Sequence, residues 1–155
     1  MTARSRADVG RTPLACLILM IVALVAACDD HGLGDARARW NKRGLTTYRV
    51  TSIRSCVCDP DTLRPMQIEV VSGQIVGAVF ADDQQPVDDS IRRFLWTVDK
   101  AFDVIQSALD DGADQLDVRF DPVLGYPTSM FIDYERRIAD EELRLRLEDL
   151  TPTAL

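Results

Sequence analysis

The chain has 155 residues, of which 46% are hydrophobic and 28% are charged, enough apolar material for one domain with its own core. Its 25 acidic and 18 basic residues give a formal net charge of −7, which argues against a nucleic-acid-binding surface. The single histidine, His31, lies near the start of the chain, which leaves few groups for acid–base catalysis. We therefore expect no nucleic-acid partner and no His-dependent enzyme.

The first 27 residues have the three parts of a secretory signal peptide. Three arginines give a basic start, and residues 14–27 form an uncharged apolar run. As a helix this run would be about 21 Å long, too short for a hydrocarbon core of about 30 Å. The run closes on Leu24-Val25-Ala26-Ala27-Cys28, which resembles the processing and acylation site of bacterial lipoproteins.

This resemblance implies a lipid anchor at Cys28. In such lipoproteins the cysteine carries a diacylglycerol thioether and usually a third acyl chain, and two or more chains hold a protein stably on a membrane without crossing it. Asp29 resembles a retention signal for the inner membrane, which would place the domain on its periplasmic face in a Gram-negative bacterium. The alternative is plain secretion with a free Cys28 thiol.

Residues 28–35 predict a lipidated tether between the anchor and the folded domain. We expect His31, in the middle of this tether, to have no chemical role. Loss of the signal peptide would remove three arginines and one aspartate, so the formal charge would change from −7 to −9. A domain this acidic should be repelled by anionic lipid head groups.

Residues 36–155 predict a single α+β domain. Strands are expected where apolar and polar residues alternate, most clearly in a hairpin over 66–80 that turns at Ser72-Gly73. The elements expected in chain order are a short helix at 36–43, a strand from 46 to 58, the two hairpin strands, a helix of about 20 residues at 91–109, and strands at 116–120, 130–134 and 143–147. For 143–147 a helix is the alternative. This order favours helices on one face of a mostly antiparallel sheet of about six strands.

Cys56 and Cys58 are the strongest chemical feature of the domain. On a regular strand their Cα atoms would lie about 6.6 Å apart, at the edge of the range for a disulfide, so bonding needs a bend that Asp59-Pro60 could supply. We favour a structural disulfide in an oxidising compartment. The alternatives are a redox pair, in which one thiolate attacks a partner and the other resolves, or a site for Cu(I) or Zn(II).

Carboxylates are the other candidates for chemistry. Their convergence could support hydrolytic or lytic catalysis, although nothing in their spacing requires it; the residues concerned are Asp121, Asp133, Asp140, Glu141 and Glu142. The sequence has no Gly-rich phosphate loop, nucleophile elbow or zinc helix. We therefore expect a protein that is not an enzyme and has no cofactor.

Two further features suggest binding. Four aspartates crowd the end of the expected long helix, where a Ca²⁺ ion or simple solvation would relieve their repulsion; they are Asp110, Asp111, Asp114 and Asp117. Their spacing does not match an EF-hand, and we favour solvation without a metal. Trp96 falls off the apolar stripe. It either packs on Arg or Lys stems, packs under the N-terminal helix with Trp40, or anchors a partner.

The ordered motifs of the domain resemble a family of small exported bacterial proteins of unknown function. These motifs are Trp40, Tyr48, Cys56-Val57-Cys58, Gly73, Phe120-Asp121-Pro122, Gly125-Tyr126-Pro127, Ile132-Asp133 and Asp140-Glu141-Glu142. The resemblance implies a shared fold and export but no activity. We expect a non-catalytic binding or accessory module of the cell envelope that binds another envelope protein or a ligand, with binding candidates at Trp96, Tyr126, Asp121 and Asp133. The alternative is a thiol-redox accessory protein.

Overall fold

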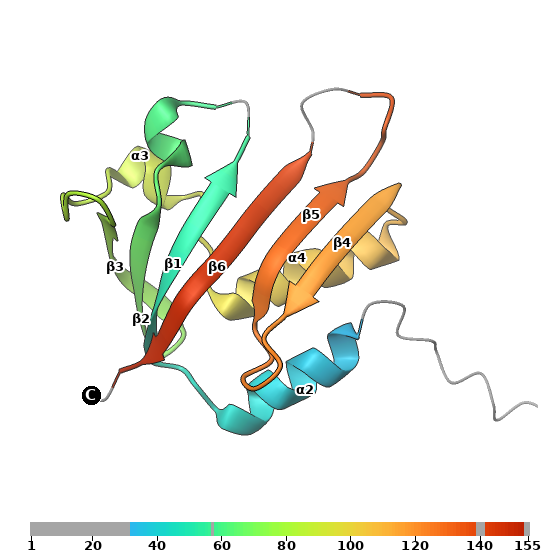
Figure 1. Ribbon diagram of the computed structural model, residues 1–155, viewed down its shortest axis with the longest axis horizontal. Helices are drawn as coiled ribbons and strands as arrows, with labels where there is room; N and C mark the ends of the chain where they lie inside the picture. Colours follow the sequence, from blue (N-terminus) through green and yellow to red (C-terminus); the bar gives the residue numbers. More distant parts are fainter. Residues whose placement is uncertain (1–31, 57, 139–141, 154–155) are drawn as a thin grey trace, which may run out of the picture.

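The computed structural model describes residues 32–56, 58–138 and 142–153 (Figure 1). Its elements are α2 (Leu33–Arg43), β1 (Tyr48–Ser55), the 3-10 helix η2 (Pro60–Leu63), β2 (Met66–Val71), β3 (Gln74–Phe80), α3 (Asp89–Arg92), α4 (Val98–Asp110), β4 (Gln115–Phe120), β5 (Pro127–Asp133) and β6 (Leu143–Pro152). The six strands form one antiparallel sheet in the order β3-β2-β1-β6-β5-β4. The predicted α+β class and the six-stranded sheet are confirmed.

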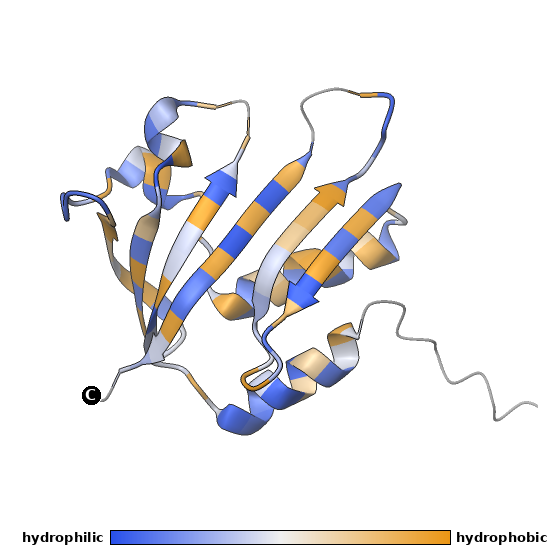
Figure 2. Ribbon diagram, in the orientation of Figure 1, coloured by the Kyte–Doolittle hydropathy of each residue, from blue (hydrophilic) through white to orange (hydrophobic). Residues whose placement is uncertain are grey.

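The sheet has one covered and one uncovered face. α4 lies across one face, and no described helix crosses the other (Figure 1). β6 shows the reason in its sequence, because Leu145 and Leu147 are buried whereas Arg144 and Arg146 are exposed. Figure 2 shows this alternation as bands of hydrophobic and hydrophilic residues along β6. In β1, β2 and β6, therefore, side chains that enter the core alternate with side chains on the other face.

The core lies between the sheet and the two longer helices. α4 contributes an apolar stripe of Val98, Phe102 and Ile105, all buried against the covered face. The remaining buried members of this core come from α2 and from four strands or their ends: Leu33, Ala36, Trp40, Tyr48, Val50, Ile68, Val70, Tyr126, Met130, Ile132, Leu145 and Leu147, together with Ala101 and Ala108 of α4. All of these residues lie between positions 33 and 147, so this segment contains the whole described main core.

One junction connects α2, β1 and the start of α4. The rings of Trp40 and Tyr48 meet edge to face, with centroids 5.5 Å apart. The indole Nε1–H of Trp40 donates to Asp99 Oδ1 at 3.0 Å, and the backbone N–H of Val98 donates to Tyr48 Oη at 2.9 Å. The two aromatic residues thus satisfy polar groups at the first turn of α4, whose N–H groups lack partners within the helix.

Replacing Tyr48 by Phe should lower the free energy of unfolding by about 1–2 kcal/mol, because the buried N–H of Val98 loses its acceptor. Burial raises the pKa of Tyr48 to about 12. Burial thus favours the neutral phenol in the folded state, so the free energy of unfolding keeps its full value below pH about 10 and falls as the pH rises from about 10 through about 12. Urea unfolding across this range should show a shallower decline for the variant.

The matched control is Tyr134→Phe, because the Tyr134 side chain is exposed and no hydrogen bond of its hydroxyl is found among the described residues. It should change the free energy of unfolding by less than about 0.5 kcal/mol. Equal losses in the two variants would show that the Tyr48 hydroxyl does not stabilise the junction.

The turn between β4 and β5 packs closely against α2. Gly125 has a φ of +88°, and a Cβ atom there would lie 2.3 Å from the carbonyl oxygen of Ala36 and 2.9 Å from the Cβ of Arg39. Only a residue without a side chain allows this approach. The turn closes through the backbone N–H of Gly125, which donates to the carbonyl of Asp121 at 3.0 Å.

Gly125→Ala should therefore separate the turn from α2 and lower the free energy of unfolding by about 3 kcal/mol or more. Gly112→Ala is the control, since Gly112 has a similar φ of +71° but no atom within 4 Å of the added Cβ. It should cost only the backbone strain, about 1 kcal/mol. If thermal or urea unfolding gave the two variants the same stability, the close approach would have no energetic importance.

The expected long helix at 91–109 is wrong, because the structure has two helices there, α3 and α4, separated by residues 93–97. Thr97 adopts an extended conformation, and its side chain accepts a hydrogen bond from the N–H of Lys100, which starts α4 as an N-cap. Arg54 Nη2 also donates to the carbonyl of Phe94 at 2.9 Å. These interactions stabilise the interruption between α3 and α4. The sequence does not show this interruption, because the apolar residues keep helical spacing across it.

The first described helix begins earlier than expected. α2 starts at Leu33 and not at Ala36, so the last three residues of the expected tether are helical. Cys28, His31 and the apolar run at 14–27 lie outside the described residues. Within the described ranges, no helix is both long and apolar enough to span a bilayer.

Candidate binding site on the uncovered sheet face

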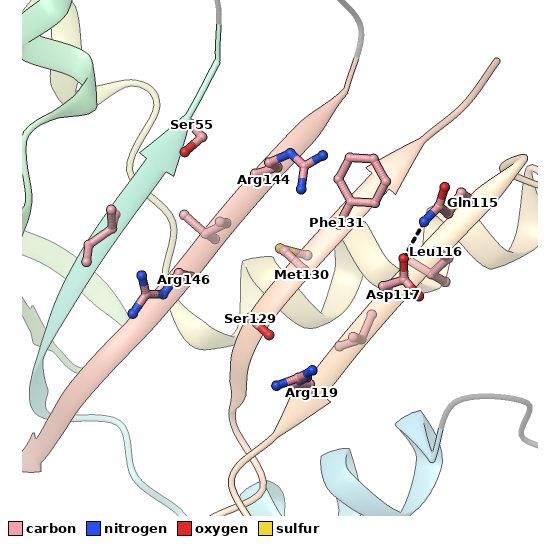
Figure 3. Close-up of a pocket in the computed structure, with 13 residues that line it drawn as sticks. Ser55, Gln115, Leu116, Asp117, Arg119, Ser129, Met130, Phe131, Arg144 and Arg146 are labelled. Atoms are coloured by element: carbon pink, nitrogen blue, oxygen red, sulfur yellow. Dashed lines mark hydrogen bonds between the residues drawn. The ribbon is translucent and has the colours of Figure 1, made fainter. Parts of the chain in front are cut away.

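The uncovered face of the sheet is hollowed over β1, β6, β5 and β4. The hollow has a volume of about 730 Å³ (Figure 3). Its lining is Ile53, Ser55, Gln115, Leu116, Asp117, Val118, Arg119, Ser129, Met130, Phe131, Arg144, Leu145 and Arg146. We call this hollow the open face. It combines guanidinium groups, hydroxyl groups and one aromatic ring in a single concave surface.

Strand register places the lining side chains in two rows. One row runs Ile53, Arg146, Ser129 and Arg119, and the next runs Ser55, Arg144, Phe131 and Asp117. Each row crosses four strands, so residues far apart in sequence become neighbours. Arg119 and Arg146 face the same serine from opposite sides.

The open face is locally basic although the chain is acidic. Its lining contains three arginines and one carboxylate, Asp117, which accepts a hydrogen bond from Gln115 at 2.5 Å. The guanidinium of Arg144 lies 3.9 Å from the centroid of the Phe131 ring (Figure 3), and Arg146 pairs with Glu148. Arg119 has no ion-pair or hydrogen-bond partner for its guanidinium among the described residues. Such a surface suits an anionic ligand.

Two of the predicted binding residues, Asp121 and Tyr126, lie together outside the open face, in the β4–β5 turn. Asp121 Oδ1 accepts from the N–H groups of Val123 and Leu124 at 2.9 and 2.6 Å. Tyr126 is only 7% exposed, and burial followed by the nearby Asp121 charge raises the pKa of its hydroxyl. Both residues hold the turn in shape.

Asp133 lies away from the β4–β5 turn. It ends β5 at the opposite end from Pro127, and it is buried. Its Oδ1 atom has no hydrogen-bond partner among the described residues. The structure therefore separates Asp133 from Asp121, and of the other predicted acids Asp140 and Glu141 lie outside the described residues.

Trp96 lies in the segment between α3 and α4 and is half-buried. The guanidinium of Arg54 lies 4.6 Å from the centroid of its ring, and the indole packs against the main core. Packing on an arginine stem was one of the expected alternatives, and the arginine is Arg54 of β1. The desolvation of Arg54 lowers the pKa of its guanidinium.

Cys56 and Cys58 form a disulfide just beyond the end of β1. Their Cα atoms lie 5.4 Å apart, closer than on a regular strand, because β1 ends at Ser55. Cys58 is exposed and Cys56 is half-buried. The predicted bond is confirmed, and it lies next to Ser55, a lining residue of the open face.

The aspartates after α4 are mostly hydrogen-bonded to protein groups. Asp110 accepts from the Gln106 side chain at 2.9 Å, and Asp114 Oδ2 accepts from the N–H of Arg136 at 3.1 Å. Among the described ranges, no group of three or more His, Cys, Asp or Glu residues could hold a metal ion. These contacts relieve part of the repulsion that suggested a Ca²⁺ site.

The sequence alone does not indicate that the arginines and the phenylalanine of the open face form one surface. The alternation of Leu143, Leu145 and Leu147 indicates that Arg144 and Arg146 lie on a solvent face. It does not indicate that Arg119 lies two strands away on the same face. That information comes only from the pairing of β6 with β5 and of β5 with β4.

A family described as a family of unknown function (DUF6174) matches residues 32–152, from the residue before α2 to the end of β6. No curated protein and no solved structure matches the chain. The expected membership of a family without an assigned activity is confirmed over nearly the whole folded domain. The export that the resemblance implied stays a prediction.

Proposed function

The chain belongs to this family of unknown function, and we propose that it is a non-catalytic binding module of the bacterial cell envelope. In this proposal it is exported, held on a membrane by acylated Cys28, and binds an acidic segment of another envelope protein on its open face. The observation that carries the proposal is the group of three arginines in a concave surface of an otherwise acidic chain. Charge complementarity of this kind speeds and orients association.

The spacing of the arginines favours an extended segment as the ligand. Arg144 and Arg146 are two residues apart on β6, so their Cα atoms are separated by about 6.7 Å along the strand. Acidic side chains on alternate residues of an extended peptide have the same spacing. Arg119, two strands away, would contact a carboxylate beside this line, while Phe131 offers an apolar contact at the centre.

Binding is tested with two fluorescent eight-residue peptides, one alternating Glu and Ser and the other alternating Gln and Ser. Anisotropy titrations should show binding of the glutamate peptide only, weakened by salt because the contacts are ionic. The double variant Arg144→Gln, Arg146→Gln should weaken it by about tenfold or more.

The matched control is Arg39→Gln, Lys42→Gln, which removes two exposed charges from α2 and should leave peptide affinity unchanged. Equal affinities for the two peptides, or an unchanged affinity in the Arg144 and Arg146 variant, would contradict binding at the open face. Circular dichroism of each variant confirms that the fold is intact.

The proposed export and membrane anchoring rest on the apolar run at 14–27 and on Cys28, which directly follows two alanines. Intact mass spectrometry of the protein purified from bacterial envelopes should show an N-terminus at Cys28 with acyl chains, and Cys56 and Cys58 resistant to alkylation until a reductant is added. Cys28→Ser should lose the acyl mass and the membrane association. A chain that keeps residues 1–27, or that has a free Cys28, would refute the anchor.

Thiol–disulfide exchange is a second candidate function, favoured by the exposure of Cys58 in the bonded pair. A partner dithiol would attack one sulfur, form a mixed disulfide and then close its own disulfide, leaving Cys56 and Cys58 as two thiols. The double substitution Cys56→Ser, Cys58→Ser distinguishes the two functions. A binding module should keep its affinity for the glutamate peptide, whereas exchange with a reduced dithiol should stop.

A further inference from the structure

A second basic surface lies away from the open face, between α2 and the β4–β5 turn. A hollow of about 440 Å³ there is lined by Arg39, Lys42, Arg43, Pro122 and Val123. We call it the α2 basic surface. Figure 1 shows α2 and the β4–β5 turn at the same edge of the molecule, and the close approach of Gly125 to α2 fixes their relative position.

The lining of this surface contains three cations and no carboxylate. Arg39, Lys42 and Arg43 are all exposed, and Arg43 Nη2 also donates to the carbonyl of Val123 at 3.3 Å. Arg37, on the same helix, differs because it pairs with Asp103 of α4 at 2.8 Å. Three basic groups of α2 thus remain directed at solvent in a chain whose net charge is strongly negative.

An exposed apolar side chain lies beside these cations. Val123 is 61% exposed, more than any other large hydrophobic residue in the described ranges. Exposed apolar groups next to basic groups are typical of surfaces that contact the interface of an anionic membrane. The turn that carries Val123 is held by the two hydrogen bonds to Asp121, so its tip has a defined position.

The surface also lies on the first described helix after the expected anchor. α2 begins at Leu33, five residues after Cys28, so the start of the helix can be at most about 18 Å from the anchored residue. A helix of 11 residues is about 16 Å long, so its basic end can be at most about 34 Å from the anchored residue, within reach of the bilayer surface.

We propose that the α2 basic surface lies on an anionic phospholipid bilayer, with its cations at the lipid phosphates and Val123 in the head-group region. The inference rests on the membrane anchor at Cys28 proposed above. It changes the expectation that the whole domain is repelled by anionic lipid, because positive charge is concentrated on the helix that follows the anchor in the sequence. The contact would fix the orientation of the domain relative to the membrane.

The test uses residues 28–155, which contain the whole described core, with Cys28→Ser and a hexahistidine tag ahead of residue 28. The tag attaches the chain to vesicles that contain nickel-chelating lipid, so the result does not depend on acylation. Val123→Trp places a fluorophore at the tip of the turn. Brominated lipids should quench it on vesicles with about 30% phosphatidylglycerol, and the same chain without this substitution corrects for Trp40 and Trp96.

Quenching should fall at least severalfold on phosphatidylcholine vesicles, in about 0.5 M salt, and in the variant Arg39→Glu, Lys42→Glu, Arg43→Glu. The control variant Arg119→Gln, Arg144→Gln, Arg146→Gln should keep the quenching, since it changes only the open face. Quenching that is equal on both lipids and insensitive to salt, or that persists in the α2 variant, would overturn the proposal. Because the tag replaces the acyl anchor, a free Cys28 in the native protein would refute the proposed membrane anchor and not the lipid contact of the α2 basic surface.

Discussion

The fold depends on the burial of Trp40 and Tyr48 at the point where α2, β1 and α4 meet. These two side chains exclude water from the junction and supply the polar partners that the first turn of α4 needs there. Since α4 is the only described helix that lies across the sheet, its starting point decides which strand residues become core. The side chains on the opposite face are then left for solvent or for a partner.

The distribution of charge follows from this one-sided arrangement. Side chains of β4, β5 and β6 that cannot enter the core include three arginines, and the exposed side of α2 carries three more basic groups. The net charge of the chain does not show either basic group, because acidic residues outnumber basic residues over the whole sequence. Interactions with partners depend on local potential as well as on net charge, so an acidic protein can still present cations where they are needed.

Sequence patterns predicted most of the fold because strand alternation and the hairpin at Ser72-Gly73 are local signals. The break before Val98 was missed, since Thr97 forms a helix cap that lies within an uninterrupted apolar stripe. Cys56 and Cys58 were found because their spacing is visible in the sequence. The open face was not found, because the alignment of Arg119 with Arg146 is decided by pairing between distant strands.

The position of β6 in the sheet affects the order in which the protein can fold. This last described strand lies in the middle of the sheet, between β1 and β5, and no other strand of the described ranges connects the β1–β3 half to the β4–β5 half. A chain that emerges N-terminus first, from a ribosome or across a membrane, must therefore wait for residues 143–152 before the sheet can close. Until then the unpaired edges of β1 and β5 can pair with strands of other chains. The sheet therefore closes only after β6 has emerged.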